Sequence, residues 1–146
     1  MRALLRRSRG KDLDAATLYE LLKLRVAVFV VEQQCPYPEL DGRDLAAGTR
    51  HFWLERDGEV VSTLRLMQEQ ASFRIGRVCT RRDARGHGHT ARLMAAALAD
   101  VGERPCHLDA QSYLVDMYAR HGFVKAGEEF LEDGIPHFPM SRVPHR

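Results

Sequence analysis

A β-hairpin followed by a strand–helix–strand unit constrains the fold of this chain more than any other feature. The strand-like runs HFWLER (51–56) and EVVSTLRLM (59–67) are joined by Asp57-Gly58, a strong two-residue turn signal. A third strand-like run covers residues 72–80, and a helical pattern over 90–101 leads to a short strand at 106–110. Hairpins need antiparallel pairing, whereas a crossover through a helix joins parallel strands. The sequence therefore predicts a mixed sheet covered by helices.

The remaining segments complete this order. We expect a strand at 2–8, a helix at 112–121 ended by Gly122, and a last hairpin of 123–132 with 135–143. Asp12 or Asp14 is expected to cap a helix with an apolar face of Leu18, Leu21, Leu22 and Leu24. VAVFVVE (26–32) fits helix or strand, and CPYPELDG (35–42) is loop. The predicted class is α/β (α+β): one mixed, mostly antiparallel sheet of six to seven strands flanked by about four helices.

Length and composition limit the function classes. A chain of 146 residues is the size of one domain, which we place at 1–146, and its net charge of +2 does not indicate a nucleic-acid partner. The longest apolar run, 26–31, is too short to span a bilayer, and the N-terminus has no secretory pattern. Three cysteines form no paired framework, which fits a reducing cytoplasm.

The stretch RRDARGHGHTARLM (81–94) lies between the third strand and the helix of 90–101. Amides of a helix's first turn have no partner inside the helix, and the helix dipole favours an anion there. Gly86 and Gly88 would let a phosphate approach the backbone, Arg85 could add a charged contact, and Thr90 a hydroxyl. The helix itself is expected to bury Ala91, Met94, Ala95, Leu98 and Val101 and to end at Gly102.

Other interpretations of the same stretch are a solvated turn, a nucleic-acid patch and a metal site. The sequence lacks a Walker loop and the third glycine of a dinucleotide fingerprint. No aromatic residues are interleaved with the arginines, as stacking on bases would need. His87 and His89 lie two residues apart with no further ligand cluster nearby, so we expect no metal.

RVCTRRDARGHGHTARLM (77–94) resembles the signature of the GNAT superfamily of acyl-CoA-dependent N-acyltransferases, [Q/R]-x-x-G-x-[G/A] at the start of a helix. Arg85 and Gly88 match, and Thr90 departs from the usual small residue. A second family motif is matched by Gln111, Tyr118 and Gly122-Phe123, with Gln in place of Asn. The segments 18–45, 50–51, 75–78 and EDGIPH (132–137) resemble the ElaA-like branch of the superfamily.

The resemblance implies the GNAT fold, with acetyl-CoA between two central strands that splay apart near 78–80 and 106–110. It implies direct N-acetyl transfer in a ternary complex to a small-molecule or peptide amine. The sequence is equally consistent with a monomer and with a homodimer. A non-catalytic acyl-CoA-binding or sensing module of the same fold is the alternative. The implied cofactor residues are Val78, Cys79, Thr80, Arg85, Gly86, His87, Gly88, His89, Thr90 and Gln111.

Tyr118 is the implied general acid for the leaving thiolate. The base that takes the proton of the amine is left open among Glu32, His51, Asp109 and His137. One hypothesis is that acidic residues in CPYPELDGRD and GEEFLEDG line the acceptor entrance and attract a cationic amine. The alternative is that both segments are solvated loops. Cys79 and Cys106 have no adjacent base by sequence, and we expect them to pack as small apolar residues.

Overall fold

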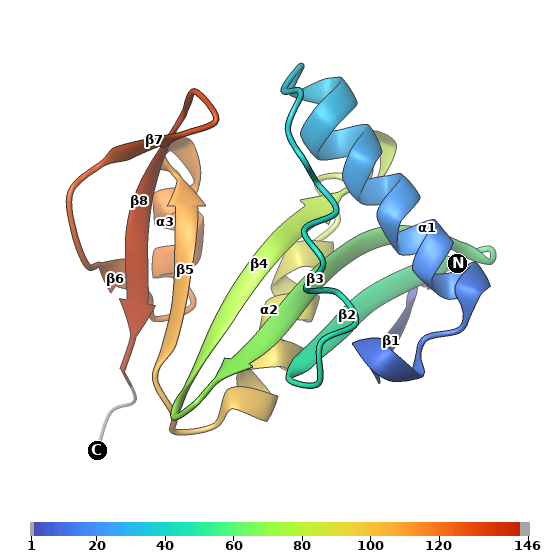
Figure 1. The fold of residues 1–146 in the computed structure, drawn as a ribbon, viewed down its shortest axis with the longest axis horizontal. Helices are drawn as coiled ribbons and strands as arrows, with labels where there is room; N and C mark the ends of the chain where they lie inside the picture. The colour runs from blue at the N-terminus through green and yellow to red at the C-terminus, as the bar shows by residue number, and fades with distance from the viewer. Residues whose placement is uncertain (1, 144–146) are drawn as a thin grey trace.

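The computed structural model describes residues 2–143 and contains one mixed sheet in the order β1-β2-β3-β4-β5-β8-β6, with β7 paired to β8 (Figure 1). Within the described residues, only β4 and β5 are parallel neighbours, and the other pairs are antiparallel. The strands are β1 (Leu4–Arg9), β2 (Thr49–Arg56), β3 (Glu59–Glu69), β4 (Ser72–Thr80), β5 (Cys106–Gln111), β6 (Val124–Lys125), β7 (Phe130–Glu132) and β8 (Ile135–Arg142).

The predicted α/β class with a mostly antiparallel mixed sheet is confirmed, and the element counts differ in detail. The sheet has eight strands because residues 123–132, expected as one strand, form the short strands β6 and β7. Both expected hairpin turns are present, since Asp57-Gly58 and Asp133-Gly134 each have two positive φ angles.

In the part of the chain that the structure describes, three α-helices accompany the sheet: α1 (Ala15–Arg25), α2 (His89–Val101) and α3 (Val115–Ala119). Asp14, one of the two predicted caps, accepts the Thr17 N–H at 2.7 Å. The ambiguous segment continues α1 as a π-helix, Val26–Glu32, and short 3-10 turns cover Gly10–Asp12, Arg82–Ala84 and Ser112–Leu114. No helix of residues 2–143 is long and apolar enough to cross a membrane.

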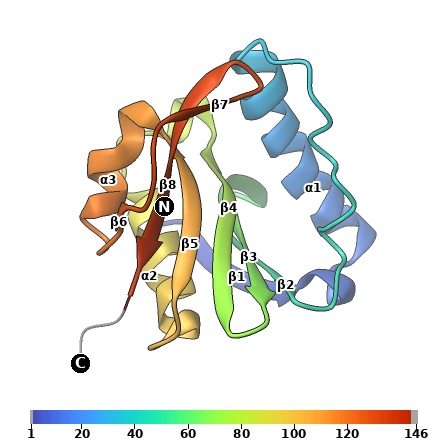
Figure 2. The same ribbon diagram turned by 60° about the vertical axis from the view of Figure 1, so that its left-hand side comes forward.

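The helices cover opposite faces of the sheet, with α1 on one face and α2 and α3 on the other (Figure 2). Leu21 and Leu24 of α1 pack against Trp53 and Cys79, as expected for the leucine face. The α2 side of the core contains Leu93, Met94, Ala97 and Val101 from the helix. The expected face of α2 is therefore wrong at Ala91 and Ala95, which are exposed. The helix is apolar almost all round, so periodicity alone could not fix which side faces the sheet.

The sheet opens between its two central strands. β4 and β5 pair only at Phe73–Cys106 and Arg74–His107, near the start of each strand, and then diverge (Figure 1). The register of β4 against β3 also shifts in this region, and Arg77 takes a left-handed conformation with φ of 51°. Such a bulge bends a strand and strengthens its twist, which turns β4 away from β5. The splay predicted by the resemblance is present.

Candidate active site

A cavity of about 790 Å³ opens where β4 and β5 separate. β4, the glycine-rich loop, the first turn of α2, α3 and the π-helix all contribute to its wall. Every predicted cofactor residue except His87, which is exposed, lines this cavity. The residues that the fold brings together here are Val78, Cys79, Thr80, Arg85, Gly86, Gly88, His89, Thr90 and Gln111.

The loop before α2 has the geometry of an anion cradle. Gly86 and Gly88 have φ angles of +83° and +76°, which favour glycine, and a Cβ added at either would meet no atom within 4 Å. The Arg92 N–H donates to the Gly88 carbonyl at 3.2 Å, so the amides of the first turn precede the helical hydrogen bonds. This part of the cavity therefore offers open space, unpaired amides and the positive end of a helix dipole.

Arg85 forms an ion pair with a carboxylate of the π-helix. Its two terminal nitrogens bind Glu32 at 2.6 and 2.7 Å, and its Nε donates to the Thr80 carbonyl at 3.0 Å. The hydrogen bonds from Arg85 hold the pKa of Glu32 below its ordinary value. Sequence reasoning placed the two residues in separate roles, whereas the fold joins the end of the π-helix to the loop across the cavity.

Two of the other three arginines of the stretch, Arg81 and Arg92, also have partners within the protein. Arg81 forms ion pairs with Glu59 at 2.7 Å and Asp83 at 2.6 Å, and Arg92 donates to the Ala3 carbonyl at 2.9 Å. Arg82 is exposed, whereas Arg81 and Arg92 are half-buried. The stretch is thus much less of an open basic patch than its sequence indicates.

A second cavity of about 360 Å³ lies between β4, β5, the loop after the π-helix and the β7–β8 turn. Six residues line both cavities, so the two spaces meet at one junction: Phe29, Gln33, Val78, Gln111, Leu114 and Tyr118. We call the larger space the donor cavity and the smaller one the acceptor cavity. Two connected cavities on either side of one tyrosine can hold two reactants that meet there.

Tyr118 projects from α3 into this junction and is 6% exposed. Its ring packs edge-to-face on Phe123, with centroids 6.4 Å apart, so the Tyr118–Phe123 spacing of the second motif is also a packing contact. No hydrogen bond is formed by its hydroxyl with residues 2–143. Burial raises the pKa of Tyr118, so the phenol keeps its proton at neutral pH.

The fold does not bring the four candidate bases together. His51 is buried outside both cavities, where its Nε2 donates to the Asp44 carbonyl at 2.9 Å, and burial lowers its pKa. Glu32 lines only the donor cavity. Asp109 and His137 line the acceptor cavity. The expected alternation of β5 is present, with Asp109 and Gln111 on the accessible face and Leu108 buried.

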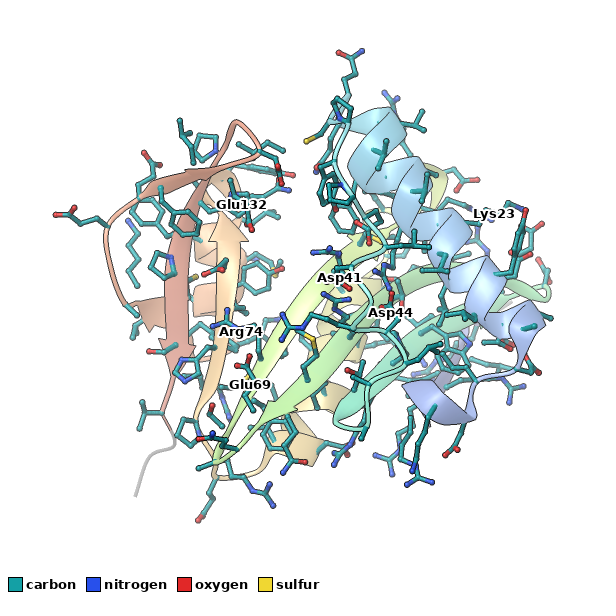
Figure 3. The ribbon with its side chains drawn as sticks, viewed as in Figure 1. Lys23, Asp41, Asp44, Glu69, Arg74 and Glu132 are labelled. Atoms are coloured by element: carbon teal, nitrogen blue, oxygen red, sulfur yellow. The ribbon has the colours of Figure 1, made fainter. Side chains whose placement is uncertain are left out.

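A largely buried ion network lies beside the acceptor cavity, and its members Asp41, Arg65 and Arg77 line that cavity. Arg25, 1% exposed, binds Glu39 at 2.7 Å and Asp44 at 2.6 Å. Arg65 binds Asp41 at 2.5 Å and Asp44 at 3.1 Å. Asp41 and Asp44 lie on the loop that crosses β3 on the α1 side of the sheet (Figure 3).

This network corrects the hypothesis that the acids of CPYPELDGRD attract an amine. Glu39 also binds Arg77 at 2.9 Å, so arginines already neutralise the three acids of the network, Glu39, Asp41 and Asp44. Hydrogen bonds from Arg65 hold the pKa of Asp41 far below its ordinary value. Sequence reasoning missed the arginines of the network, and the clustered acids of 39–44 were the available signal that such partners exist.

The cysteines are structural. All three are free and buried. Burial raises the pKa of Cys79 to about 12 and that of Cys106 to about 11, which disfavours the thiolate that a nucleophile needs. Within residues 2–143, no group of three or more His, Cys, Asp or Glu side chains is placed to hold a metal ion.

Comparison with known proteins identifies the family to which this chain belongs. A family model described as "Acetyltransferase (GNAT) domain" matches residues 18–143. The chain belongs to the GNAT acetyltransferase family. The resemblance stated from the sequence is therefore confirmed, and this GNAT chain is a member of an acyltransferase family.

Relatives of this GNAT chain support the ElaA-like branch as well. A UPF0039 protein of Mycobacterium tuberculosis is 71% identical over 94% of this chain and 92% of its own length. Protein ElaA of Escherichia coli is 38% identical over 90% of both chains. The crystal structure of an acyl-CoA N-acyltransferase from Pseudomonas aeruginosa has a TM-score of 0.93 and 41% identity, covering 97% of this chain and all of that one.

Proposed function

We propose that this GNAT chain transfers an acetyl group from acetyl-CoA to a primary amine of a small molecule or peptide, directly within a ternary complex. The observation that carries the proposal is the meeting of two cavities at Tyr118, between strands that have separated. A reaction without a covalent enzyme intermediate needs both reactants bound at once, with the reacting atoms in contact. The raised pKa values of the cysteines disfavour the covalent alternative.

The residues of the donor cavity fit acetyl-CoA. The open space beside Gly86 and Gly88 and the first-turn amides of α2 would hold its pyrophosphate. Val78 lies at the bulge of β4, on the edge that β5 leaves unpaired, where a pantetheine arm would lie alongside the strand. Bound acetyl-CoA would supply the thioester at the junction with the acceptor cavity.

Tyr118 is the proposed general acid. The amine nitrogen forms a bond to the thioester carbon, the carbon–sulfur bond breaks, and the sulfur takes the proton of the Tyr118 hydroxyl. A proton from the amine replaces it, so that the products are an amide, a thiol and one proton released to solvent. The hydroxyl forms no hydrogen bond with residues 2–143 and lies in the junction, which leaves it available to the sulfur.

Thiol release from acetyl-CoA with a panel of amines tests the reaction, and calorimetry tests acetyl-CoA binding. Calorimetry is preferred to tryptophan fluorescence because Trp53 lines neither the donor nor the acceptor cavity. Binding without thiol release for any amine would favour the non-catalytic acyl-CoA module instead. Absence of binding at millimolar acetyl-CoA would contradict both.

The free cysteines support a reducing compartment, and we propose the cytoplasm as the location. We propose a single domain over 1–146 that acts without metal, membrane or nucleic acid, as a monomer or homodimer.

A further inference from the structure

We propose that His137 is the general base that takes the proton of the acceptor amine, and that Glu132 is its positioning residue. The inference rests on the proposed function, since it concerns the amine of that reaction. It goes further because it selects one residue from four candidates and adds a second residue with a defined task.

The positions of His51 and Glu32 exclude them as the base. His51 lines neither cavity and uses its Nε2 to bind the Asp44 carbonyl. Glu32 lines the donor cavity, on the other side of the junction from the acceptor, and both its oxygens are bound by Arg85. A base must come within hydrogen-bond reach of the amine, directly or through one water, which neither side chain achieves.

His137 is next to the junction. It is the cross-strand partner of Gln111 on β5, and Gln111 lines both cavities. Side chains of directly opposed residues in antiparallel strands are neighbours on the same face, with Cβ atoms roughly 5 Å apart. Asp109 is opposed to Pro139, two residues farther from the junction, and lies 3.6 Å from Arg74, which draws its carboxylate toward β4.

Hydrogen bonding fixes the tautomer of His137. Its Nδ1 is 2.7 Å from the Ile135 carbonyl, which can only accept, so Nδ1 carries the hydrogen. The neutral ring therefore keeps its lone pair on Nε2, the nitrogen that a base needs. The ring is held further by stacking on Phe130, with centroids 5.7 Å apart.

Glu132 lies 3.8 Å from that nitrogen. Its Oε2 faces Nε2 across the tight β7–β8 turn, and its side chain is 55% exposed. Figure 3 shows Glu132 on this hairpin, across the opening of the sheet from Asp41. The carboxylate can accept a hydrogen bond from Nε2 once that nitrogen has taken the proton of the amine, which holds the ring in place. The proton passes from the ammonium nitrogen to Nε2 and then to solvent.

Other titratable groups that line the acceptor cavity come from several elements. Asp133 belongs to the same turn, Asp109 to β5, Arg74 and Arg77 to β4, Arg65 to β3, Asp41 and Arg43 to the loop after the π-helix, and the neutral Tyr118 to α3. The charge of Arg77 is neutralised by Glu39. The charged groups in the turn of the same hairpin as the ring are therefore the carboxylates of Glu132 and Asp133. They favour the approach of an ammonium group.

Two nucleophiles of nearly equal size test the assignment. Methylamine is almost fully protonated at neutral pH and needs a base, whereas hydroxylamine is largely neutral and does not. In His137→Gln, kcat/KM for methylamine should fall roughly 100-fold or more, while the value for hydroxylamine should stay within about threefold. Glu132→Gln should show a smaller loss confined to methylamine. Glu128→Gln, an exposed carboxylate that lines neither cavity, should change neither.

The outcomes separate this inference from the proposed function. Parallel losses for both nucleophiles in His137→Gln, or no loss for either, would overturn the base assignment while acetyl transfer stands. The selective loss appearing in Asp109→Asn instead would move the role to β5. If the wild-type protein acetylates neither nucleophile nor any amine of the panel, the proposed function fails and the base assignment fails with it. Retained hydroxylamine activity also shows that a variant has folded.

Discussion

Arg25 holds the loop that forms one wall of the acceptor cavity, and Arg25→Ala should destabilise the protein markedly. The guanidinium donates to Glu39 at 2.7 Å and to Asp44 at 2.6 and 3.3 Å, in a site from which solvent is excluded. Breaking a buried ion pair costs about 3–5 kcal/mol because it leaves an uncompensated charge. In this variant Glu39 remains paired with Arg77, and Asp44 remains paired with Arg65. We therefore expect a loss of stability at the lower end of this range, about 3 kcal/mol.

Urea unfolding followed by Trp53 fluorescence measures this loss directly. Trp53 is 5% exposed and packs in the same cluster as the leucines of α1, so it reports on the region that Arg25 anchors. A loss of about 3 kcal/mol corresponds to a fall in Tm of roughly 6–12 °C for a chain of this size. Arg6→Ala is the matched control, because Arg6 is 54% exposed in its pair with Glu55 and should cost less than about 1 kcal/mol.

A loss in Arg25→Ala no larger than that in Arg6→Ala would refute the reasoning that the network holds the loop. The functional counterpart is a rise in KM for the amine with little change in acetyl-CoA affinity, because Tyr37 and Asp41 of the loop line only the acceptor cavity. An equal loss of acetyl-CoA affinity would show that the whole fold has been disturbed instead.

Three further predictions follow from the site and its charges. Tyr118→Phe should lower kcat by roughly 100-fold or more with unchanged acetyl-CoA affinity, by thiol release and calorimetry, and full retention would mean that water protonates the thiolate. Glu32→Gln should tighten acetyl-CoA binding a few-fold by releasing Arg85 for the phosphates, and weaker binding would show that the carboxylate positions the arginine. The folded-state pKa of His51 is lowered by burial, so stability is present above the unfolded value of about 6.5 and declines as pH falls below it. His51→Gln should flatten this decline in urea titrations, and an unchanged slope would contradict it.

Much of the donor site could be predicted from the sequence, because its parts are local. Glycines with positive φ, the amides of one helix end and the strand just before them lie within about twenty residues, and their geometry follows from residue type. The spacing of Tyr118 to Phe123 is also local, since it places both rings at one helix end. Periodicity failed within α2, where alanines on several sides left the buried face undetermined.

The acceptor cavity depends on contacts between distant segments. Arg25 meets Asp44 and Arg77 meets Glu39 only in the folded chain, and His137 lies beside Gln111 because the sheet order brings β5 and β8 together. Partners of a charge are chosen by distance in the folded chain, and a sequence shows only that the charges exist.

The sequence by itself determined the mixed sheet, the hairpins, the glycine-rich cradle and the family, because these depend on local conformational preference and on motif spacing. Tertiary structure alone decided which carboxylates are neutralised, which arginines are paired and which candidate bases line the acceptor cavity. The physical reason is that burial and electrostatic pairing act through space, between residues that the chain brings together only when it folds.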